Sequence, residues 1–292
     1  MQLSQERKNL IQKLEKCKKV LIEVNQTCNL NCSYCFYRDY GRVTNSLSTE
    51  EIKELFINCP NANDFYLTGG ECFTSKNIDS IIELLYQRGN VTTFTNGIIL
   101  GQYDDNRFKS VVQEVNKFII SFDSFDFQNY KCRNNLEMTI DTIKRIISFN
   151  PEKVEVKVCI TKFNVGNLEN IFTNLIELGV RYLSVNFVFD INNTNFLHEV
   201  KDLETLKNIF KIIYKYERYF NKKYINTLYD LYIKNKINNN YPCIADKEYL
   251  YLDCINNLLI CPGNCKKLGK RGNWKNCYSK ECANEWEIMY ER

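Results

Sequence analysis

Three cysteines stand close together near the start of the chain, at Cys28, Cys32 and Cys35. They follow an apolar run and have the spacing C-x3-C-x2-C; we call residues 28–35 the cysteine loop. Thiolates are soft ligands that suit iron–sulfur clusters, and such clusters normally take four of them. Three thiolates hold three irons of a cubane and leave the fourth iron with an open site, where a small molecule can bind and be activated.

Chance and zinc binding are the alternatives to a cluster for this spacing. The chain has 14 cysteines among 292 residues, so the arrangement could arise by chance. Zinc is the second alternative, although zinc ribbons usually pair two C-x2-C knuckles and no second knuckle stands nearby. Five further cysteines lie on or beside expected helices and strands. These five are Cys17, Cys59, Cys72, Cys132 and Cys159. We expect most of them to be small buried hydrophobes, and we expect Cys72, next to Glu71, to face the site.

Composition narrows the class of protein. A hydrophobic share of 44% and a charged share of 25% are ordinary for a globular chain. The net charge of +4 comes from mixed basic and acidic residues without a basic arm or stripe, so we expect no nucleic-acid partner. The polar N-terminus is no secretory signal, and no apolar run approaches the ~18 residues of a membrane span. We therefore expect a cytoplasmic protein with reduced thiols and no membrane partner.

Histidine chemistry is not favoured. The chain has one histidine, His198, which follows the polar stretch Asn192-Asn193-Thr194-Asn195. This setting favours a solvated loop residue over a catalytic base.

Six short runs rich in β-branched and aromatic residues alternate with helical segments, which is the pattern of βα units around a parallel sheet. The expected strands are Val20–Val24, Asp64–Leu67, Val91–Thr95, Lys117–Phe122, Lys153–Ile160 and Tyr182–Phe187. Six strands are too few for a closed eight-stranded barrel. The predicted fold class is α/β: a partial (β/α)6 TIM-like barrel with a small C-terminal cysteine-rich domain.

Several helices have recognisable ends. Ser48-Thr49-Glu50-Glu51 is a capping box that opens the first helix after the cysteine loop. The helix with Ile78 to Leu85 at helical spacing ends near Gly89. Further helices are expected over residues 4–18, 136–149, 168–178, 202–219 and 225–236. We interpret the last two as a bridge across the open side of the barrel.

Polar or glycine-containing stretches follow the expected strands. They are the cysteine loop, Thr68-Gly69-Gly70-Glu71, Thr95-Asn96-Gly97, Ser121-Phe122-Asp123, Thr161-Lys162-Phe163-Asn164 and Asn186-Phe187. Each motif alone is weak, because Gly-Gly and Asn-Gly are common turns. Ligands of such folds bind at the carboxyl ends of strands, so the shared placement predicts one site on one rim.

The residue types suggest roles at this rim. Gly69 and Gly70 have no Cβ and allow backbone to approach a ligand closely. Glu71 offers a carboxylate to an ammonium group. Arg133 suits a bidentate grip on a carboxylate, with a surface arginine as the alternative. Asp123 could accept hydrogen bonds from ribose hydroxyls or from a substrate, with turn formation as the alternative.

Taken together, the cysteine loop, with Tyr34 before its last cysteine, and the Gly-Gly-Glu element resemble the radical S-adenosylmethionine (SAM) enzymes. The resemblance implies a SAM-binding [4Fe–4S] cluster on the three loop cysteines. It implies contacts of Gly69, Gly70 and Glu71 with the methionine amine, and of Ser121 and Arg133 with its carboxylate. The remaining expected cofactor-binding residues are Asp123 and, near adenine, the backbone around Tyr34 and the ring of Phe187, for which core packing is the alternative.

The last fifty residues contain a second group of cysteines: Cys243, Cys254, Cys261, Cys265, Cys277 and Cys282. Apolar runs at 249–252 and 258–260 predict a hairpin joined near Asn256-Asn257. This tail resembles the SPASM and twitch extensions of radical SAM enzymes, with Asn256 in place of the usual glycine. A full SPASM block, C-x2-C-x5-C-x3-C, is absent. The resemblance implies one auxiliary Fe–S cluster, held by Cys243, Cys261, Cys277 and Cys282, in which Cys254 or Cys265 could substitute for one ligand; structural zinc is the alternative.

These observations divide the chain into four expected regions. They are an N-terminal helix (1–19), a radical SAM core (20–190), a helical bridge (191–240) and a SPASM/twitch-like domain (241–292). The resemblance implies that reduced flavodoxin or ferredoxin supplies one electron, that SAM yields a 5′-deoxyadenosyl radical, and that this radical abstracts hydrogen from the substrate. A ribosomal peptide undergoing maturation is the first substrate hypothesis, a small metabolite the second, and a non-enzymatic metal-binding protein the third. The sequence indicates no catalytic acid, base or radical residue.

Overall fold

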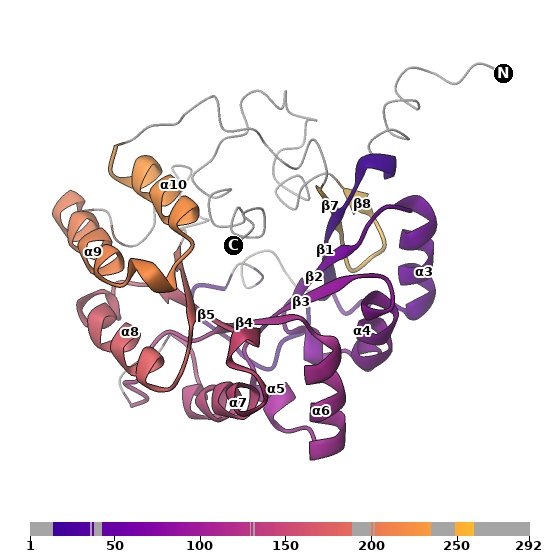
Figure 1. Cartoon of the computed structure of the whole chain (residues 1–292), viewed down its shortest axis with the longest axis horizontal. Coiled ribbons are helices and arrows are strands. Elements are labelled where there is room, and N and C mark those ends of the chain that lie inside the picture. The colour runs from indigo at the N-terminus through magenta and orange to yellow at the C-terminus, as the bar shows by residue number, and fades with distance from the viewer. Residues whose placement is uncertain are drawn as a thin grey trace.

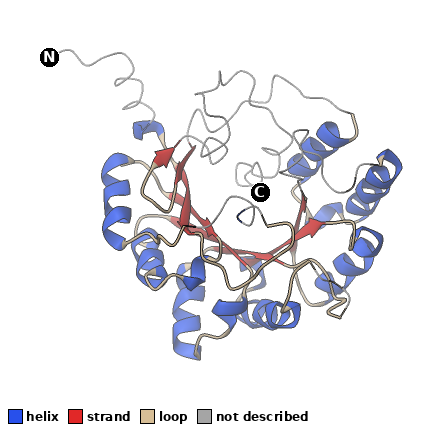
Figure 2. Cartoon of the chain, turned by 180° about the vertical axis from the view of Figure 1, so that it is seen from behind, coloured by secondary structure: helices blue, strands red, loops and turns tan. Residues whose placement is uncertain are grey.

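The chain folds around one curved sheet, with helices along its outer face (Figure 1). The computed structural model describes residues 14–35, 37, 43–128, 130, 132–188, 200, 202–234 and 249–259. Across the sheet the strands are β6 (Tyr182–Phe187), β5 (Val154–Ile160), β4 (Lys117–Ser121), β3 (Asn90–Thr95), β2 (Asp64–Gly69), β1 (Lys19–Asn25), β7 (Tyr249–Leu252) and β8 (Leu258–Leu259). Seen from behind, the strands form an open arc with the helices outside it (Figure 2).

The first six strands pair in parallel and in sequence order, so the predicted open α/β barrel is confirmed. Because the strands are parallel, their carboxyl ends share one rim, as the sequence pattern predicts. The hairpin expected near Asn256 is also present, since β8 pairs antiparallel with β7. It does not stand apart from the barrel: β7 pairs in parallel with β1 and extends the same sheet.

Helices connect the strands along the convex face. They are α3 (Thr49–Asn58), α4 (Ile78–Tyr86), α5 (Ile98–Gly101), α6 (Asp105–Glu114), α7 (Leu136–Phe149), α8 (Leu168–Glu177), α9 (Leu203–Lys215) and α10 (Lys222–Tyr232). Short 3-10 turns are η1 (Cys72–Thr74), η2 (Pro151–Lys153), η3 (Val165–Asn167) and η4 (Glu217–Tyr219). The predicted capping box is confirmed: Ser48 caps α3, and the Glu51 carboxylate accepts the N–H of Ser48 at 2.7 Å.

The two sides of the strands carry different residues. On β5, Val154, Val156 and Val158 belong to the apolar core under the helices. The alternate residues include Glu155, which accepts a hydrogen bond from Lys117 at 3.4 Å, and face the concave side. The convex side therefore supplies the hydrophobic core, and the concave side supplies polar groups to the rim.

Helices α9 and α10 continue the helical layer past α8. The rings of Phe210 and Tyr232 lie 6.1 and 4.5 Å from that of Phe187 on β6, and Tyr224 Oη donates to the carbonyl of Val185 at 2.9 Å. The described residues of both helices thus pack on the outer face of β6. The helical bridge expected over 191–240 stays a prediction, because much of that range lies outside the described residues.

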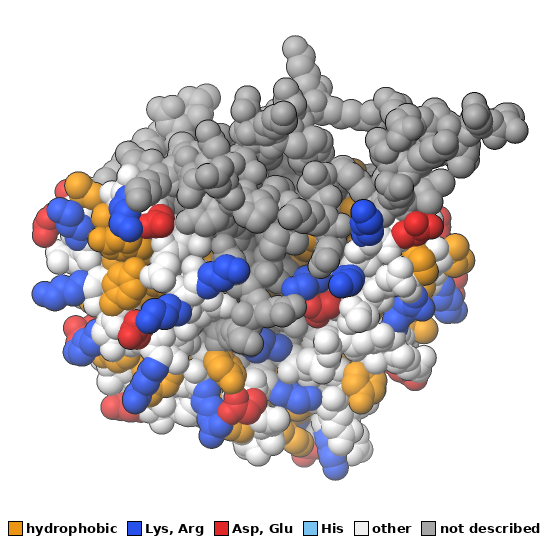
Figure 3. All heavy atoms as spheres, turned by 45° about the horizontal axis from the view of Figure 1, so that its top comes forward, with side chains coloured by type: hydrophobic (Ala, Val, Ile, Leu, Met, Phe, Trp, Pro, Cys, Tyr) orange, Lys and Arg blue, Asp and Glu red, His pale blue; other side chains and the backbone are white. Residues whose placement is uncertain are grey.

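The visible described surface mixes basic and acidic side chains, without a one-sign patch (Figure 3). None of the helices in the described ranges is long and apolar enough to cross a membrane. Of the N-terminal helix expected over 4–18, residues 14–16 are described and helical. His198 and the cysteines Cys243, Cys261, Cys265, Cys277 and Cys282 lie outside the described residues.

Candidate active site

The cysteine loop begins against the glycines that end β2. The N–H of Gly70 donates to the carbonyl of Asn25 at 2.9 Å, and that of Glu71 donates to Thr27 at 2.8 Å. A Cβ on Gly69 would lie 2.1 Å from the Asn25 carbonyl oxygen, and one on Gly70 would lie 2.4 Å from that of Thr27. The close approach expected of these glycines is therefore made to the chain's own backbone, just before the first cysteine of the loop.

The Glu71 side chain points into the protein and is 1% exposed. Its carboxylate accepts hydrogen bonds from Thr95 Oγ1 at 2.7 Å, the N–H of Asn96 at 2.7 Å and the N–H of Phe73 at 3.2 Å. Burial raises the pKa of this carboxyl group, against the lowering effect of these donors. Both oxygens are engaged in joining the end of β2 to the end of β3. Because the Glu71 carboxylate is occupied in this way, the Gly-Gly-Glu element can contact a ligand through its main-chain groups.

The end of β3 holds the cysteine loop from the next position along the rim. Asn96 Nδ2 donates to Asn29 Oδ1 at 2.8 Å and lies 4.0 Å from the sulfur of Cys28. The N–H of Leu30 donates to the same sulfur at 3.4 Å, and the Leu30 side chain packs with Ile98. Asn96 was expected at the rim, but without a role. The Asn-Gly pair directly after a strand was the sequence feature that could have indicated this contact with the cysteine loop.

A third set of contacts joins the loop to the end of β4. The Tyr34 hydroxyl donates to Asp123 Oδ2, and Arg133 Nε donates to the same oxygen at 2.8 Å. Arg133 Nε and Nη2 also donate to the Tyr34 hydroxyl at 3.2 and 3.0 Å. The N–H of Ser33 donates to the carbonyl of Cys132 at 3.0 Å. Three predicted site residues thus meet, and the alternative of a surface arginine is excluded, because the Arg133 side chain is 9% exposed.

These contacts place a positive charge beside the thiols. Burial raises the pKa of the Cys32 thiol to about 11, and the Arg133 guanidinium opposes that rise. Burial alone would lower the pKa of Arg133, but Tyr34 and Asp123 outweigh it and raise this pKa above its ordinary value. A guanidinium that stays charged favours thiolate in its neighbours, which is the form that binds metal.

The donor set fits an iron–sulfur cluster. The loop brings Cys28, Cys32 and Cys35 around one small apolar group. Within the part of the chain that the structure describes, no three His, Cys, Asp or Glu side chains converge on a single point as a lone metal ion requires. In a cubane each thiolate binds a different iron, so three thiols on one loop are a suitable donor set for three of its irons.

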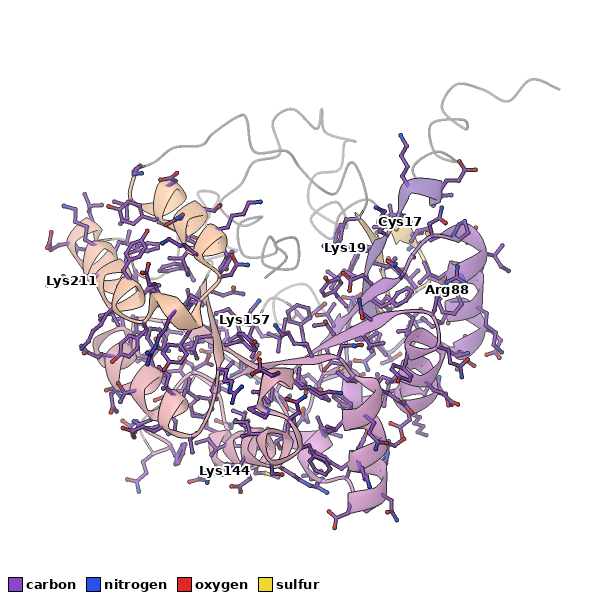
Figure 4. All side chains as sticks on the ribbon, in the orientation of Figure 1. Cys17, Lys19, Arg88, Lys144, Lys157 and Lys211 are labelled. Atoms are coloured by element: carbon purple, nitrogen blue, oxygen red, sulfur yellow. The ribbon has the colours of Figure 1, made fainter. Side chains whose placement is uncertain are left out.

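Two further predicted residues, Ser121 and Phe187, lie apart from this group, as does Lys157, for which the sequence indicated no role. Ser121 ends β4 two positions before Asp123, on the same face of that strand. Lys157 lies on the inner side of β5 (Figure 4), and its Nζ is 5.0 Å from the centre of the Phe94 ring. Phe187 is 1% exposed and packs under the outer helices, so its ring takes the core-packing role and corrects the expected adenine contact.

The remaining described cysteines are mostly buried. Cys72 is fully buried, with its sulfur 3.6 Å from the carbonyl oxygen of Phe94, so it does not face the rim as expected. Cys254 is 2% exposed, and its N–H donates to Glu23 Oε2 at 3.3 Å. Glu23 also accepts a hydrogen bond from Tyr37, just after the cysteine loop. The turn after β7 is thus tied to the first strand of the barrel.

The structure thus combines an open parallel barrel with a three-cysteine loop that is fastened to three strand ends beside a buried arginine. The family model of the Radical SAM superfamily matches residues 22–171, slightly more than half of the 292 residues. The chain belongs to the Radical SAM superfamily.

Curated relatives share modest identity. A probable GTP 3′,8-cyclase of Sulfurisphaera tokodaii is 26% identical over 220 residues, which cover 71% of this chain and 69% of the relative. A probable GTP 3′,8-cyclase of Methanococcus aeolicus is 25% identical over 181 residues, which cover 59% of this chain and 60% of the relative. The match therefore leaves about a third or more of each relative's length uncovered.

Solved structures show the same fold at lower identity. Streptococcus suis SuiB bound to precursor peptide SuiA has a TM-score of 0.69 and 16% identity over 95% of this chain and 66% of that chain. Native anSMEcpe with bound AdoMet and a peptide has a TM-score of 0.64 and 16% identity over 90% of this chain and 79% of that chain. The likeness therefore covers nearly the whole chain, beyond the family match.

Proposed function

We propose that this protein is a radical SAM enzyme whose [4Fe–4S] cluster is held by Cys28, Cys32 and Cys35. The observation that carries the proposal is the fastening of this loop to the ends of β2, β3 and β4, which fixes three thiols on one rim. With cluster and SAM bound, one electron from reduced flavodoxin or ferredoxin would cleave SAM to methionine and a 5′-deoxyadenosyl radical that abstracts hydrogen from the substrate. So reactive a species requires a site that excludes water, which the concave side of the barrel would help to supply.

The chain's own residues would bind and orient SAM. The main chain of Gly69, Gly70 and Glu71 would lie against the methionine amine. Among the described residues Arg133 Nη1 makes no hydrogen bond, so it can donate to the methionine carboxylate, with the Ser121 hydroxyl nearby on the rim. The backbone around Tyr34 would contact adenine.

We propose a peptide as the substrate, which would be crosslinked, epimerised or oxidised. The fold likeness to SuiB and anSMEcpe, both solved with peptides, extends over 95% and 90% of this chain and supports this substrate. Strand β8 of the hairpin ends at Leu259, two residues before Cys261. An auxiliary cluster on Cys243, Cys261, Cys277 and Cys282 remains part of the proposal; these four residues lie outside the described ranges.

A small metabolite is the second candidate, favoured by the curated relatives named as GTP 3′,8-cyclases. The concave face offers suitable chemistry. Lys157 and Phe94 place a cation beside an aromatic ring there, and such a pair suits an anionic, ring-containing molecule such as a nucleotide.

Anaerobic reconstitution tests the proposed reaction. With two clusters, wild type should hold about eight irons and the Cys28/Cys32/Cys35→Ala variant about four. With SAM and dithionite, wild type should release 5′-deoxyadenosine and the variant should not. Cys59→Ala, which removes a fully buried cysteine away from the loop, is the matched control and should behave as wild type. Unchanged iron in the triple variant, or no 5′-deoxyadenosine from wild type, would rule out the proposed cluster site.

A second assay separates the substrates. For a metabolite enzyme of this kind, GTP should raise 5′-deoxyadenosine release above the rate without substrate, and Lys157→Met should abolish that rise. For a peptide enzyme, GTP should have no effect, and a short peptide encoded beside the gene should raise the release and itself change mass.

A further inference from the structure

The carboxylate of Asp123 joins three separate segments of the chain. One oxygen, Oδ2, accepts hydrogen bonds from the Tyr34 hydroxyl and from Arg133 Nε at 2.8 Å. The other, Oδ1, accepts the N–H of Cys159 at 2.9 Å. These donors belong to the cysteine loop, the segment before α7 and strand β5. The side chain of Asp123 is 0% exposed.

This arrangement favours a structural role for Asp123 over the expected contact with ribose hydroxyls or a substrate. The carboxylate is fully buried, and both of its oxygens already accept hydrogen bonds from the chain itself. Its hydrogen-bond partners Tyr34 and Arg133 are the residues that the proposed function places at the cofactor. We therefore expect Asp123 to affect the cofactor mainly through these two residues.

We propose that Asp123 is a positioning residue, which locks the cysteine loop onto the end of β4 and aims Arg133 at the anionic end of SAM. The inference rests on the proposed radical SAM function and adds a residue that touches neither SAM nor iron. It follows from what each partner would lose without the carboxylate.

Tyr34 stands between Cys32 and Cys35, so a fixed phenol fixes the turn that carries both sulfurs. The ring is partly buried and packs against the buried group of Leu30, Cys32 and Ile98. Its hydroxyl is held by Asp123 on one side and by Arg133 on the other. Without the acceptor, the loop keeps the hydrogen bonds from Arg133 to the Tyr34 hydroxyl and one main-chain link to this segment, from Ser33 to Cys132.

Arg133 depends on Asp123 in a different way. A buried guanidinium needs a counter-charge, and Asp123 is its salt-bridge partner. Arg133 donates to Asp123 through Nε and to the Tyr34 hydroxyl through Nε and Nη2, which leaves Nη1 for a second anion. Neutralising Asp123 would remove the constraint that selects this orientation.

The test uses the reconstituted full-length protein and Asp123→Asn, Tyr34→Phe and their double variant. Asp123→Asn should lose iron to a chelator about ten- to a hundredfold faster than wild type and bind SAM more weakly by a similar factor, as expected for weakening hydrogen bonds that involve charged groups. Tyr34→Phe should accelerate iron loss, and adding it to Asp123→Asn should cause little further change, because both act through one contact. The electron paramagnetic resonance signal of the reduced cluster should respond less to SAM in Asp123→Asn.

Matched controls separate this role from general damage. Asp104→Asn keeps a good N-cap on α6, and Tyr86→Phe changes a half-exposed tyrosine on α4; both should match wild type. Wild-type iron loss and SAM affinity in Asp123→Asn, or additive effects in the double variant, would overturn the inference. If Asp123→Asn does not fold, as judged by circular dichroism, Tyr34→Phe decides the matter by the same two measurements. A wild type that holds no cluster on the loop would overturn both the proposed function and this inference.

Discussion

Glu71 at the end of β2 accepts a hydrogen bond of 2.7 Å from the backbone N–H of Asn96 at the end of β3. The same carboxylate accepts from Thr95, so one buried group joins two neighbouring strand ends under the cysteine loop. Replacing Glu71 by Gln would place two amide N–H donors against either the Asn96 N–H or the donors on the other oxygen, whereas the protonated acid places only one O–H there. Glu71→Gln should therefore lower the free energy of unfolding by about 1–3 kcal/mol at pH 5, measured by urea denaturation.

The pH dependence of this difference has a definite sign. Burial raises the pKa of Glu71 in the folded protein, so its stabilising contribution is fully present below its unfolded pKa of about 4.3 and falls as the pH rises through the folded pKa. The advantage of wild type over Glu71→Gln should shrink between pH 5 and pH 8. Glu177→Gln, on the exposed side of α8, should show no such trend. An advantage that grows with pH would show that the charged form is the stabilised one.

Gly70→Ala should displace the start of the cysteine loop. The new Cβ would lie 2.4 Å from the Thr27 carbonyl oxygen and 2.5 Å from that of Gln26, both of which are backbone atoms. We expect a loss of about 1–3 kcal/mol in the free energy of unfolding and a lower iron content after reconstitution. Gly166→Ala is the matched control, because a Cβ there meets nothing within 4 Å, and it should be neutral or stabilising by up to about 1 kcal/mol. Equal stability and iron content in the two variants would contradict this role of Gly70.

The strands and their shared rim could be predicted because they depend on local patterns. Tyr182–Phe187 matches β6 residue for residue, and Val20–Val24 lies within β1. The face of each strand was harder to predict. Six of the seven residues of β1 are buried, so an alternating pattern does not mark which side meets the helices. The same ambiguity left Phe187 with two expected roles until the packing of α10 decided between them.

The contacts within the site depend on long-range geometry that spacing does not encode. Tyr34 and Asp123 are 89 positions apart, and Tyr34 and Arg133 are 99 apart. Residue type indicated that Arg133 could bind a carboxylate, but not that one edge already binds Asp123. Likewise, the family pattern assigned Glu71 to a ligand, whereas Thr95 and Asn96 hold its carboxylate in the structure.

Arg133→Lys should weaken SAM binding while leaving the charge in place. A lysine Nζ can still form the ion pair with Asp123. Unlike the guanidinium, it has no second planar edge that could bind a carboxylate at the same time. We expect the dissociation constant for SAM to rise about tenfold, the effect of losing a charge-assisted hydrogen bond, as measured by equilibrium binding to the reconstituted protein. Arg107→Lys, at a half-exposed ion pair with Asp79, is the matched control and should bind SAM as wild type does. An unchanged constant in Arg133→Lys would remove the carboxylate-binding role.

Asn256 holds the turn of the β7–β8 hairpin in a left-handed conformation, with a φ of 63°. Its Nδ2 also donates to Glu54 at the surface, at 3.1 Å. Asn256→Gly should stay within about 0.5 kcal/mol of wild type, because glycine tolerates this φ and only a surface hydrogen bond is lost. Asn256→Ala loses the same bond and adds strain, so it should be less stable than Asn256→Gly by about 1 kcal/mol in urea denaturation. Equal stability of the two variants would mean that the left-handed turn does not constrain the hairpin that extends the barrel sheet at β1.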